Sequence, residues 1–413
     1  MKQAIILFST LLLFTVCRGQ EGSTGQRGSV GQNASVVLLR GRIVSASNGE
    51  AIGYATISLA RNGIETMSNE EGRFTFKIPA ADAGDSIFIS HIGYQSVVLL
   101  INGQDTGMAT IALKEKSDEL PGVTVTPVSA VDIIHRAMDK IPDNYPAEPY
   151  TSYGFYRFAS WHDSKIIYLS EAIFDIYCPD NDRANKQFRL IKARMDRDEE
   201  AFKGSNWTMG RTPNGLMNDD LASRIHETEV LGDEGMQQHN YIVKGMIDYE
   251  GRPAYEIRFD QKDGVADAGY KGRIIIDSQS LAFVRIEYEL SPKGSAYWQQ
   301  NRGGGTPRGI AMIITYRKYG GKYYLNHVSR DAQWKIEPLH GFEVRNKSFY
   351  LVTRIDTGQQ KSDLKGKLIR NNEAIEVNAK RNSPRQDNYW DNYNSIEADF
   401  NVDSVLRVMR HGN

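Results

Sequence analysis

Apolar and polar residues alternate in short runs between residues 40 and 113. In the run 73–78, Phe74, Phe76 and Ile78 share one side, and polar residues occupy the other. Since successive side chains along a strand point to opposite faces, such runs predict strands with one buried face. Turns that contain glycine separate the runs, and about seven short strands of this kind favour an antiparallel β-sandwich.

A longer strand-rich part follows. Residues 281–290 carry Val284, Ile286 and Tyr288 on one face, with charged residues between them. Turn residues between neighbouring runs predict sequential hairpins, and hence a long antiparallel meander that must curl or be covered. Further strands are predicted over residues 150–160, 165–177, 241–247, 253–259, 272–276, 310–319 and 322–336.

Few helices are predicted. Ser129 is a candidate N-cap for a helix that continues to about Lys140, because apolar residues recur there at helical spacing. A terminal helix is expected over residues 402–409. Residues 179–238 have weaker patterning, and we interpret them as a solvated insertion rather than a binding lid.

The predicted fold class is therefore mainly β. An antiparallel sandwich is followed by a larger, curved, half-barrel-like antiparallel sheet with few helices. The predicted segments are a signal peptide (1–19), a flexible tether (20–35), the sandwich (36–114), a linker (115–128), the half-barrel-like domain (129–357) and a polar C-terminal tail with a terminal helix (358–413).

The N-terminus has the pattern of a secretory signal peptide. Lys2 precedes the apolar run 4–16, which is shorter than the roughly 20 residues that a membrane-spanning helix needs. Cleavage is expected after Gly19. The alternative is lipidation of Cys17, although the residues before it do not match a lipobox. Cleavage would leave Cys178 alone, so no intramolecular disulfide is expected.

Composition narrows the class of partner. Charged residues make up 24% of the chain, and the formal net charge is −1. A near-neutral chain lacks the basic surface that nucleic-acid binding requires, so no nucleic-acid partner is expected. No later apolar run is long enough for a membrane helix, so the mature chain is expected to have no transmembrane span. The expected location is the periplasm or the outer membrane.

The first strand-rich part also resembles a known family, the carboxypeptidase regulatory-like domain. The resemblance implies a transthyretin-like sandwich of the kind found on many secreted and outer-membrane proteins of Bacteroidetes. It implies no activity, because the same module occurs on proteins of unrelated function. The segments that carry it are Gly41-Arg42-Ile43-Val44, Ala51-Ile52-Gly53-Tyr54-Ala55-Thr56-Ile57, Ser68-Asn69-Glu70-Glu71-Gly72-Arg73-Phe74 and Ser90-His91-Ile92-Gly93-Tyr94-Gln95.

In the second part, the segments 251–257, 272–277 and 283–288 are similar to the lipoprotein-carrier-type half-barrels. That resemblance implies a concave face that accepts an apolar ligand, or a partner's lipid or strand. A filled, sealed core is the alternative, since alternation alone does not distinguish a lining from a core. The candidate ligand-binding residues, expected on one inward face, are Val284, Ile286, Tyr288, Tyr153 and Phe155.

The sequence offers few candidates for catalysis. The sequence contains no nucleophile elbow and no phosphate-binding loop. His226 and Glu229 have a spacing that suits zinc, with His327 or His340 as a distant third ligand. The neighbouring motifs of a metallocarboxypeptidase are not recognisable, so no catalytic residue, metal or cofactor is assigned.

The predicted function is that of a non-enzymatic binding or scaffolding protein, which binds a cell-envelope protein or an apolar ligand. The alternative is a zinc-dependent peptidase.

Overall fold

The structure is a computed structural model of the 413-residue chain. It describes residues 36–59, 63–101, 108–116, 129–180, 185–201, 212, 215–216, 218–301, 306–336, 342–358, 367–370, 390 and 393–411. The predicted signal peptide and tether, and most of the predicted linker, lie outside these residues. Among the helices that are described, none is long and apolar enough to cross a membrane.

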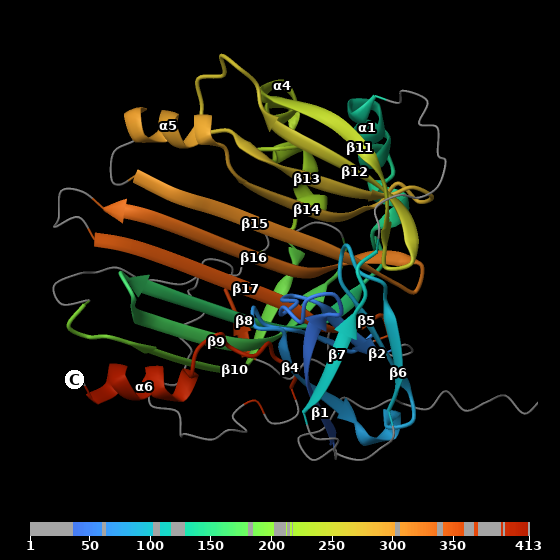
Figure 1. Cartoon of the computed structure of the whole chain (residues 1–413), viewed down its shortest axis with the longest axis vertical. Coiled ribbons are helices and arrows are strands. Elements are labelled where there is room, and N and C mark those ends of the chain that lie inside the picture. The colour runs from blue at the N-terminus through green and yellow to red at the C-terminus, as the bar shows by residue number, and fades with distance from the viewer. Residues whose placement is uncertain are drawn as a thin grey trace, which may run out of the picture.

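The N-terminal module is a sandwich of two small sheets (Figure 1). Its core contains Phe74, Phe76 and Ile78, as the alternation predicts. One strand pair departs from the antiparallel prediction, because the chain enters the last strand by crossing from the other sheet. The first sheet has the order β4-β1-β7, with β1 (Val36–Ser45), β4 (Arg73–Pro79) and β7 (Ala109–Leu113), and β1 and β7 are parallel. The second has the order β3-β2-β5-β6, with β2 (Thr56–Leu59), β3 (Glu65–Met67), β5 (Ser86–Ser90) and β6 (Val97–Leu100), and the short helix η1 (Ala80–Asp82) precedes β5.

The second part is one large antiparallel sheet that curves without closing, as predicted. Its strands are β8 (Tyr150–His162), β9 (Lys165–Cys178), β10 (Gln187–Arg197), β11 (His239–Tyr249), β12 (Arg252–Gln261), β13 (Tyr270–Asp277), β14 (Phe283–Leu290), β15 (Thr306–Tyr319), β16 (Lys322–Ile336), β17 (Phe342–Asp356) and β18 (Lys367–Ile369). Their order is β11-β12-β13-β14-β15-β16-β17-β8-β9-β10-β18. The hairpin chain β11 to β17 is thus extended by β8, β9 and β10, which come from the start of the sequence of this part, and then by β18, which comes from its end.

Helices are few and peripheral. They are α1 (Ala130–Asp139), α2 (Ile141–Asn144), η3 (Leu221–Glu227), α4 (Asp233–Gln238), α5 (Pro292–Asn301) and α6 (Val402–His411). Helix α1 begins where predicted, since the backbone N–H of Asp132 donates to the side chain of Ser129 at 3.4 Å. Its apolar side, which includes Ile133 and Ile134, is buried against the large sheet.

Residues 179–238 are not simply a solvated insertion, which corrects our interpretation. They supply β10, which pairs with β9, and a segment whose Leu221 and Ile225 are buried in the main core. Patterning over this stretch is weak because a mixture of a strand, short helices and turns gives no single period.

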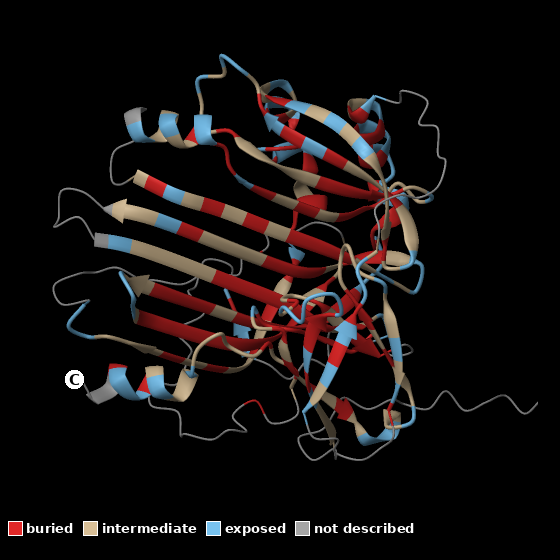
Figure 2. Ribbon diagram, viewed as in Figure 1, coloured by how far each residue is buried: buried red, intermediate tan, exposed pale blue. Residues whose placement is uncertain are grey.

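The large sheet has two differently covered faces. Ile286, Ile314, Val328, Tyr350 and Tyr156 pair in succession across five neighbouring strands, so they share one face. Helices α1 and η3 pack on that side, which we call the helix-covered face. The N-terminal module packs on the other side, the module-covered face (Figure 1). Figure 2 shows that the strands are most continuously buried where they pass the module.

Candidate functional site

The junction between the module and the large sheet is filled by residues 393–400, which we call the C-terminal strap. The strap contacts both parts. The backbone N–H of Lys77 donates to Asn394 Oδ1 at 2.8 Å, and Asn394 Nδ2 donates back to Lys77 O at 3.0 Å. From the sheet, Arg157 Nη2 donates to the carbonyl oxygen of Ile396 at 2.9 Å. Three segments far apart in the sequence therefore meet at one place.

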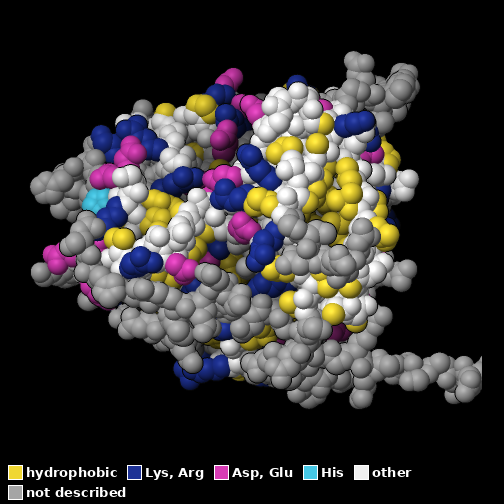
Figure 3. Space-filling model, turned by 60° about the horizontal axis from the view of Figure 1, so that its bottom comes forward, with side chains coloured by type: hydrophobic (Ala, Val, Ile, Leu, Met, Phe, Trp, Pro, Cys, Tyr) yellow, Lys and Arg dark blue, Asp and Glu magenta, His cyan; other side chains and the backbone are white. Residues whose placement is uncertain are grey.

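A cleft with a volume of about 200 Å³ opens at this junction, and we call it the junction cleft. It carries charged side chains of both signs together with aromatic rings. The face of the molecule seen in Figure 3 likewise has basic and acidic side chains interspersed. The lining residues are Tyr54 and Glu70 from the module, Arg157, Ala159, Trp161, Arg345, Lys347 and Phe349 from β8 and β17, and Ile396, Glu397, Asp399 and Phe400 from the C-terminal segment.

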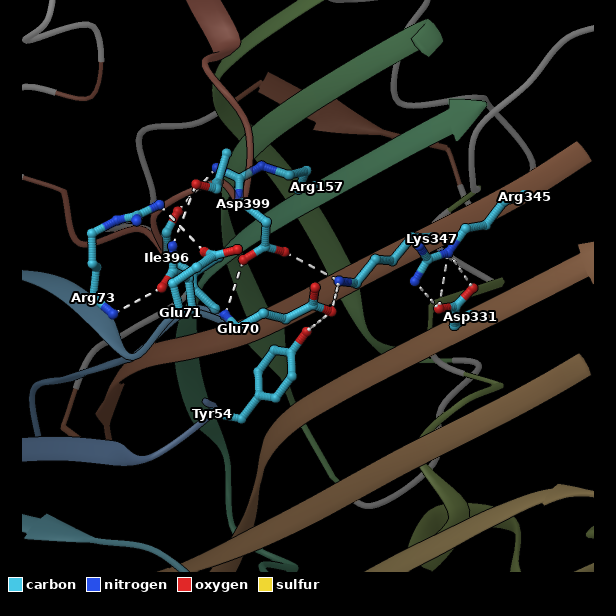
Figure 4. A network of polar contacts seen from close by, with 12 residues as sticks. Tyr54, Glu70, Glu71, Arg73, Arg157, Asp331, Arg345, Lys347, Ile396 and Asp399 are labelled. Carbon is cyan, nitrogen blue, oxygen red and sulfur yellow. Dashed lines mark hydrogen bonds and ion pairs between the residues drawn. The ribbon is translucent and has the colours of Figure 1, made fainter. Parts of the chain in front are cut away.

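Lys347 contacts two carboxylates in a polar network at the junction (Figure 4). Its ammonium group contacts the carboxylate of Glu70 and lies 3.2 Å from Asp399 Oδ2. Tyr54 donates from its hydroxyl to Glu70 Oε1 at 2.8 Å, and the backbone N–H of Glu70 donates to Asp399 Oδ1 at 2.9 Å. The network therefore ties the module, the sheet and the strap together.

Tyr54 and Glu70 each keep one protonation state near neutral pH. Burial raises the pKa of Tyr54 far above its ordinary value, so its hydroxyl stays protonated and can donate. Partial burial would raise the pKa of Glu70, but hydrogen bonds from Lys347 and Tyr54 outweigh it and hold that pKa below its usual range. Tyr54 also has a positive φ of 61°, which is uncommon for a residue other than glycine and places its side chain in the junction.

Arg157 is positioned by a buried carboxylate. Glu171 accepts from Arg157 Nε at 2.7 Å and from Arg194 Nε at 2.6 Å, and its side chain is fully buried. Burial would raise the pKa of Glu171, but the two guanidinium charges outweigh it and lower the pKa. The carboxylate thus stays ionised and fixes the Arg157 fork that reaches the strap.

Aromatic rings form the apolar part of the cleft. Tyr54 stacks on His327 and Phe349, with ring centroids 6.2 and 6.4 Å away. Trp161 meets Phe400 edge to face at 6.0 Å. Flat rings beside fixed charges can bind a ligand that has both an apolar face and polar groups. Because Glu70 stays ionised and Tyr54 stays protonated near neutral pH, neither side chain suits proton transfer in that range.

The five candidate ligand residues do not share a face, which corrects the single inward face we predicted. Val284, Ile286 and Tyr288 lie on the helix-covered face, in a packed core in which Ile286 is 0% exposed. Tyr153 and Phe155 lie on the opposite face, because Tyr156 is the β8 residue that aligns with the Ile286 row. The arrangement around Ile286 is the filled-core alternative, and a ligand role for these residues stays a prediction.

The structure does not bring His327 close to His226 and Glu229, the proposed zinc ligands. His226 and Glu229 are exposed near η3, on the side of the helix-covered face. His327 is buried on the module-covered face, against Phe349. His340 lies outside the described residues. Within the part of the chain that the structure describes, no group of three His, Cys, Asp or Glu side chains could hold a metal ion.

The junction cleft was not predicted from the sequence. Glu70 belongs to a segment that predicts a turn, and the strap lies in the part that we predicted as a polar tail. One local signal was present, because Arg345 and Lys347 occupy alternate positions of a strand and so share a face. Charged residues on one face of a strand are, however, equally typical of solvent exposure.

A comparison with protein-family models bears on the module. Residues 39–125 match the CarboxypepD_reg-like domain. The match confirms the resemblance to this family and covers a minor part of the 413 residues. The matched stretch of the regulatory-like module includes Tyr54 and Glu70 of the junction cleft.

Comparisons with whole proteins add little. No curated protein matches the chain. A DUF1329 family protein from Desulfovibrio piger is 10% identical, with a TM-score of 0.24, over 57% of this chain and 97% of that one. A protein of unknown function from Bacteroides fragilis is 9% identical, with a TM-score of 0.16, over 78% of this chain and 99% of that one. Lipovitellin, whose structure is described in terms of lipid–protein interactions, is 7% identical, with a TM-score of 0.24, over 55% of this chain and 27% of that one. Similarities this low carry no argument about function.

Proposed function

We propose that the protein is an exported, non-enzymatic binding or scaffolding protein of the periplasm or outer membrane, and that the junction cleft is its binding site. The observation that carries this proposal is the size and make-up of the cleft. Its volume is about 200 Å³, whereas two other cavities lined by described residues hold about 10 Å³ each. Concave sites with aromatic walls and a few fixed polar groups are the usual places for ligands.

The chemistry of the cleft favours a polar occupant. Arg157, Arg345 and Lys347 line it together with Glu70 and Asp399, so a ligand with both donor and acceptor groups finds partners of both signs. The faces of Trp161 and Tyr54 would pack on its apolar part. A purely apolar ligand would instead remove these charged groups from water, and this desolvation costs free energy even where they are paired with one another. We therefore favour a polar component of the cell envelope over the apolar ligand of the carrier hypothesis.

Native mass spectrometry of protein isolated from its own cell envelope tests the proposal. We expect wild type to carry a bound component that Trp161→Ala and Lys347→Met lose. Trp298→Ala is the matched control, because Trp298 packs on Trp334 at another part of the sheet. Retention of the component by both cleft variants, or its absence from wild type, would contradict this site assignment.

A further inference from the structure

The C-terminal strap is held in the way that a bound peptide is held. Its described residues belong to no strand, so it makes no regular ladder with either sheet. Instead, side chains bridge to main-chain groups across the junction. Asn394 satisfies both the N–H and the carbonyl of Lys77, which lies on β4, an edge strand of the first module sheet. Thr66 and Asn69 donate to strap carbonyls at 3.4 Å each.

Two apolar anchors accompany these hydrogen bonds. Ile396 is 4% exposed and packs between the module and the sheet. Trp390, just before the strap, is 7% exposed, meets the ring of Phe155 edge to face at 5.6 Å and lies 5.4 Å from the guanidinium of Arg194. Main-chain hydrogen bonds with buried anchors at intervals are how proteins recognise extended peptides.

The surface under the strap also contacts two acidic residues of the strap. Thr75 donates from its hydroxyl to Glu397 Oε1 at 2.5 Å, and Arg73 Nε lies 3.7 Å from Glu397 Oε2. Lys347 faces Asp399 two residues further on (Figure 4). A segment that fits this surface therefore has a carboxamide where the strap has Asn394 and an aliphatic residue where it has Ile396. It has acidic residues at the positions of Glu397 and Asp399.

The strap is tethered by a long stretch of sequence. Residues 371–389 connect the end of the β18 region to Trp390. A stretch of about 19 residues can extend to roughly 60 Å, whereas a compact protein of 413 residues has a radius of gyration of only about 22 Å. The strap can therefore leave its surface without any change in the pairing of β18.

We propose that the surface formed by Thr66, Asn69, Thr75, Lys77 and Arg157 is a peptide-recognition groove, and that the strap is its tethered occupant. The partner it fits is an extended acidic segment of another protein with the same pattern of carboxamide, aliphatic anchor and acids. Such a segment binds when the strap leaves.

Competition between the tethered and a free segment tests this. The probe is a fluorescein-labelled peptide of residues 390–411, measured by fluorescence anisotropy with the full chain. A tethered occupant competes at an effective concentration in the millimolar range, so wild type should bind the probe weakly. The full chain with Asn394→Leu and Ile396→Asp has a weakened strap and should bind the probe at least about tenfold more tightly, which corresponds to about 1.4 kcal/mol. A peptide that carries the same two substitutions is the matched control and should not bind.

Equal binding of the probe by wild type and by a folded double variant, or no binding by either, would overturn the proposal. If circular dichroism shows that the double variant does not fold, a second arm decides. Wild-type chain with a protease site placed within residues 371–389 is cut after folding, and the labelled peptide is then added. Exchange of the cut segment for the label supports the groove, and a segment that never exchanges shows that the strap is a permanent part of the core.

Discussion

Ile286 and Ile242 are the same residue type in opposite surroundings. Ile286 is 0% exposed on β14, whereas Ile242 is 59% exposed on β11, an edge strand of the large sheet. Removing apolar contacts and burying an unpaired amide both destabilise a packed site, while an exposed site leaves the amide in water. The pair therefore separates a filled core from an open lining.

We expect Ile286→Asn to lower the free energy of unfolding by more than about 2 kcal/mol, and Ile242→Asn to change it by no more than about 0.5 kcal/mol. Denaturant unfolding measures both. An environment-sensitive apolar dye should bind neither wild type nor Ile286→Asn. A stable Ile286→Asn protein whose dye binding is weaker than that of wild type would instead restore the apolar carrier hypothesis.

His327 links the junction to pH. Burial, helped by the charge of Arg285, lowers its pKa from 6.5 to about 3. The unfolded chain therefore binds more protons than the folded chain between these values, so stability falls as pH falls through this window. We expect His327→Phe to reduce the loss of unfolding free energy between pH 7 and pH 5, measured by chemical denaturation. His226→Gln, at an exposed position, should leave the pH dependence as in wild type, and an unchanged slope in His327→Phe would refute this account.

At the scale of elements, the turn between β3 and β4 depends on a glycine. Gly72 has a φ of 75°, and a Cβ there would overlap the backbone carbonyl oxygen of Ile43. Gly49 has a nearly identical φ of 74°, but nothing lies within 4 Å of the position of its Cβ. The two positions share the conformational strain of a left-handed residue, and only one adds a collision.

Alanine at Gly49 should cost about 1–2 kcal/mol through backbone conformation alone. Alanine at Gly72 should cost about 1–3 kcal/mol more, because the β1 backbone must move. Thermal unfolding of the two variants compares them directly. Equal destabilisation of the two variants would mean that the β1 backbone at Ile43 moves aside with no loss in the free energy of unfolding.

The strands also show which parts of the fold could be predicted from the sequence. Alternation predicted the module strands and most of the large sheet, because each such strand has one apolar face. In β8, alternation could not identify the helix-covered face, because Phe155 and Tyr156 place an aromatic ring on each face of the strand. Bulges such as that between Val352 and Arg354 also shift the register between neighbours, so the parity of one strand does not fix that of the next.

The junction cleft could not be predicted from alternation, for a different reason. Its residues come from three parts of the sequence that lie far apart, and they meet only through the packing of the module and the strap on the sheet. The positive φ of Tyr54 is likewise set by this tertiary context. Local patterns predict elements, whereas a site between two units depends on how the units dock.

For the whole molecule, one buried ion pair tests that docking. Glu65 on β3 of the module contacts Arg317 on β15, and the exposed fractions of these side chains are 3% and 20%. Burial raises the pKa of Glu65 to about 7, although the Arg317 charge opposes this shift. Without Arg317 the pKa should rise further, so the unpaired carboxylate would be most costly at high pH.

We therefore expect Arg317→Met to destabilise the protein by about 3 kcal/mol or more at pH 8 and by less at pH 5. Glu65→Gln combined with Arg317→Met removes the ionisable partner and should recover part of the loss while flattening the pH dependence. Denaturant unfolding of the two proteins at both pH values provides the measurement. A single variant whose cost is independent of pH would show that Glu65 is not left charged and unpaired.

The strap also sets an order of events during synthesis. The hydrogen bond between Asn69 and the carbonyl of Ala398 joins residues 329 positions apart, and contacts of such separation form late because a long loop must close first. The strap leaves the ribosome after every sheet strand has been made. We therefore expect the module to fold early as a unit and to be fixed on the sheet only once residues 393–400 have been made. The strap would then distinguish chains that contain these residues from shorter chains that lack them.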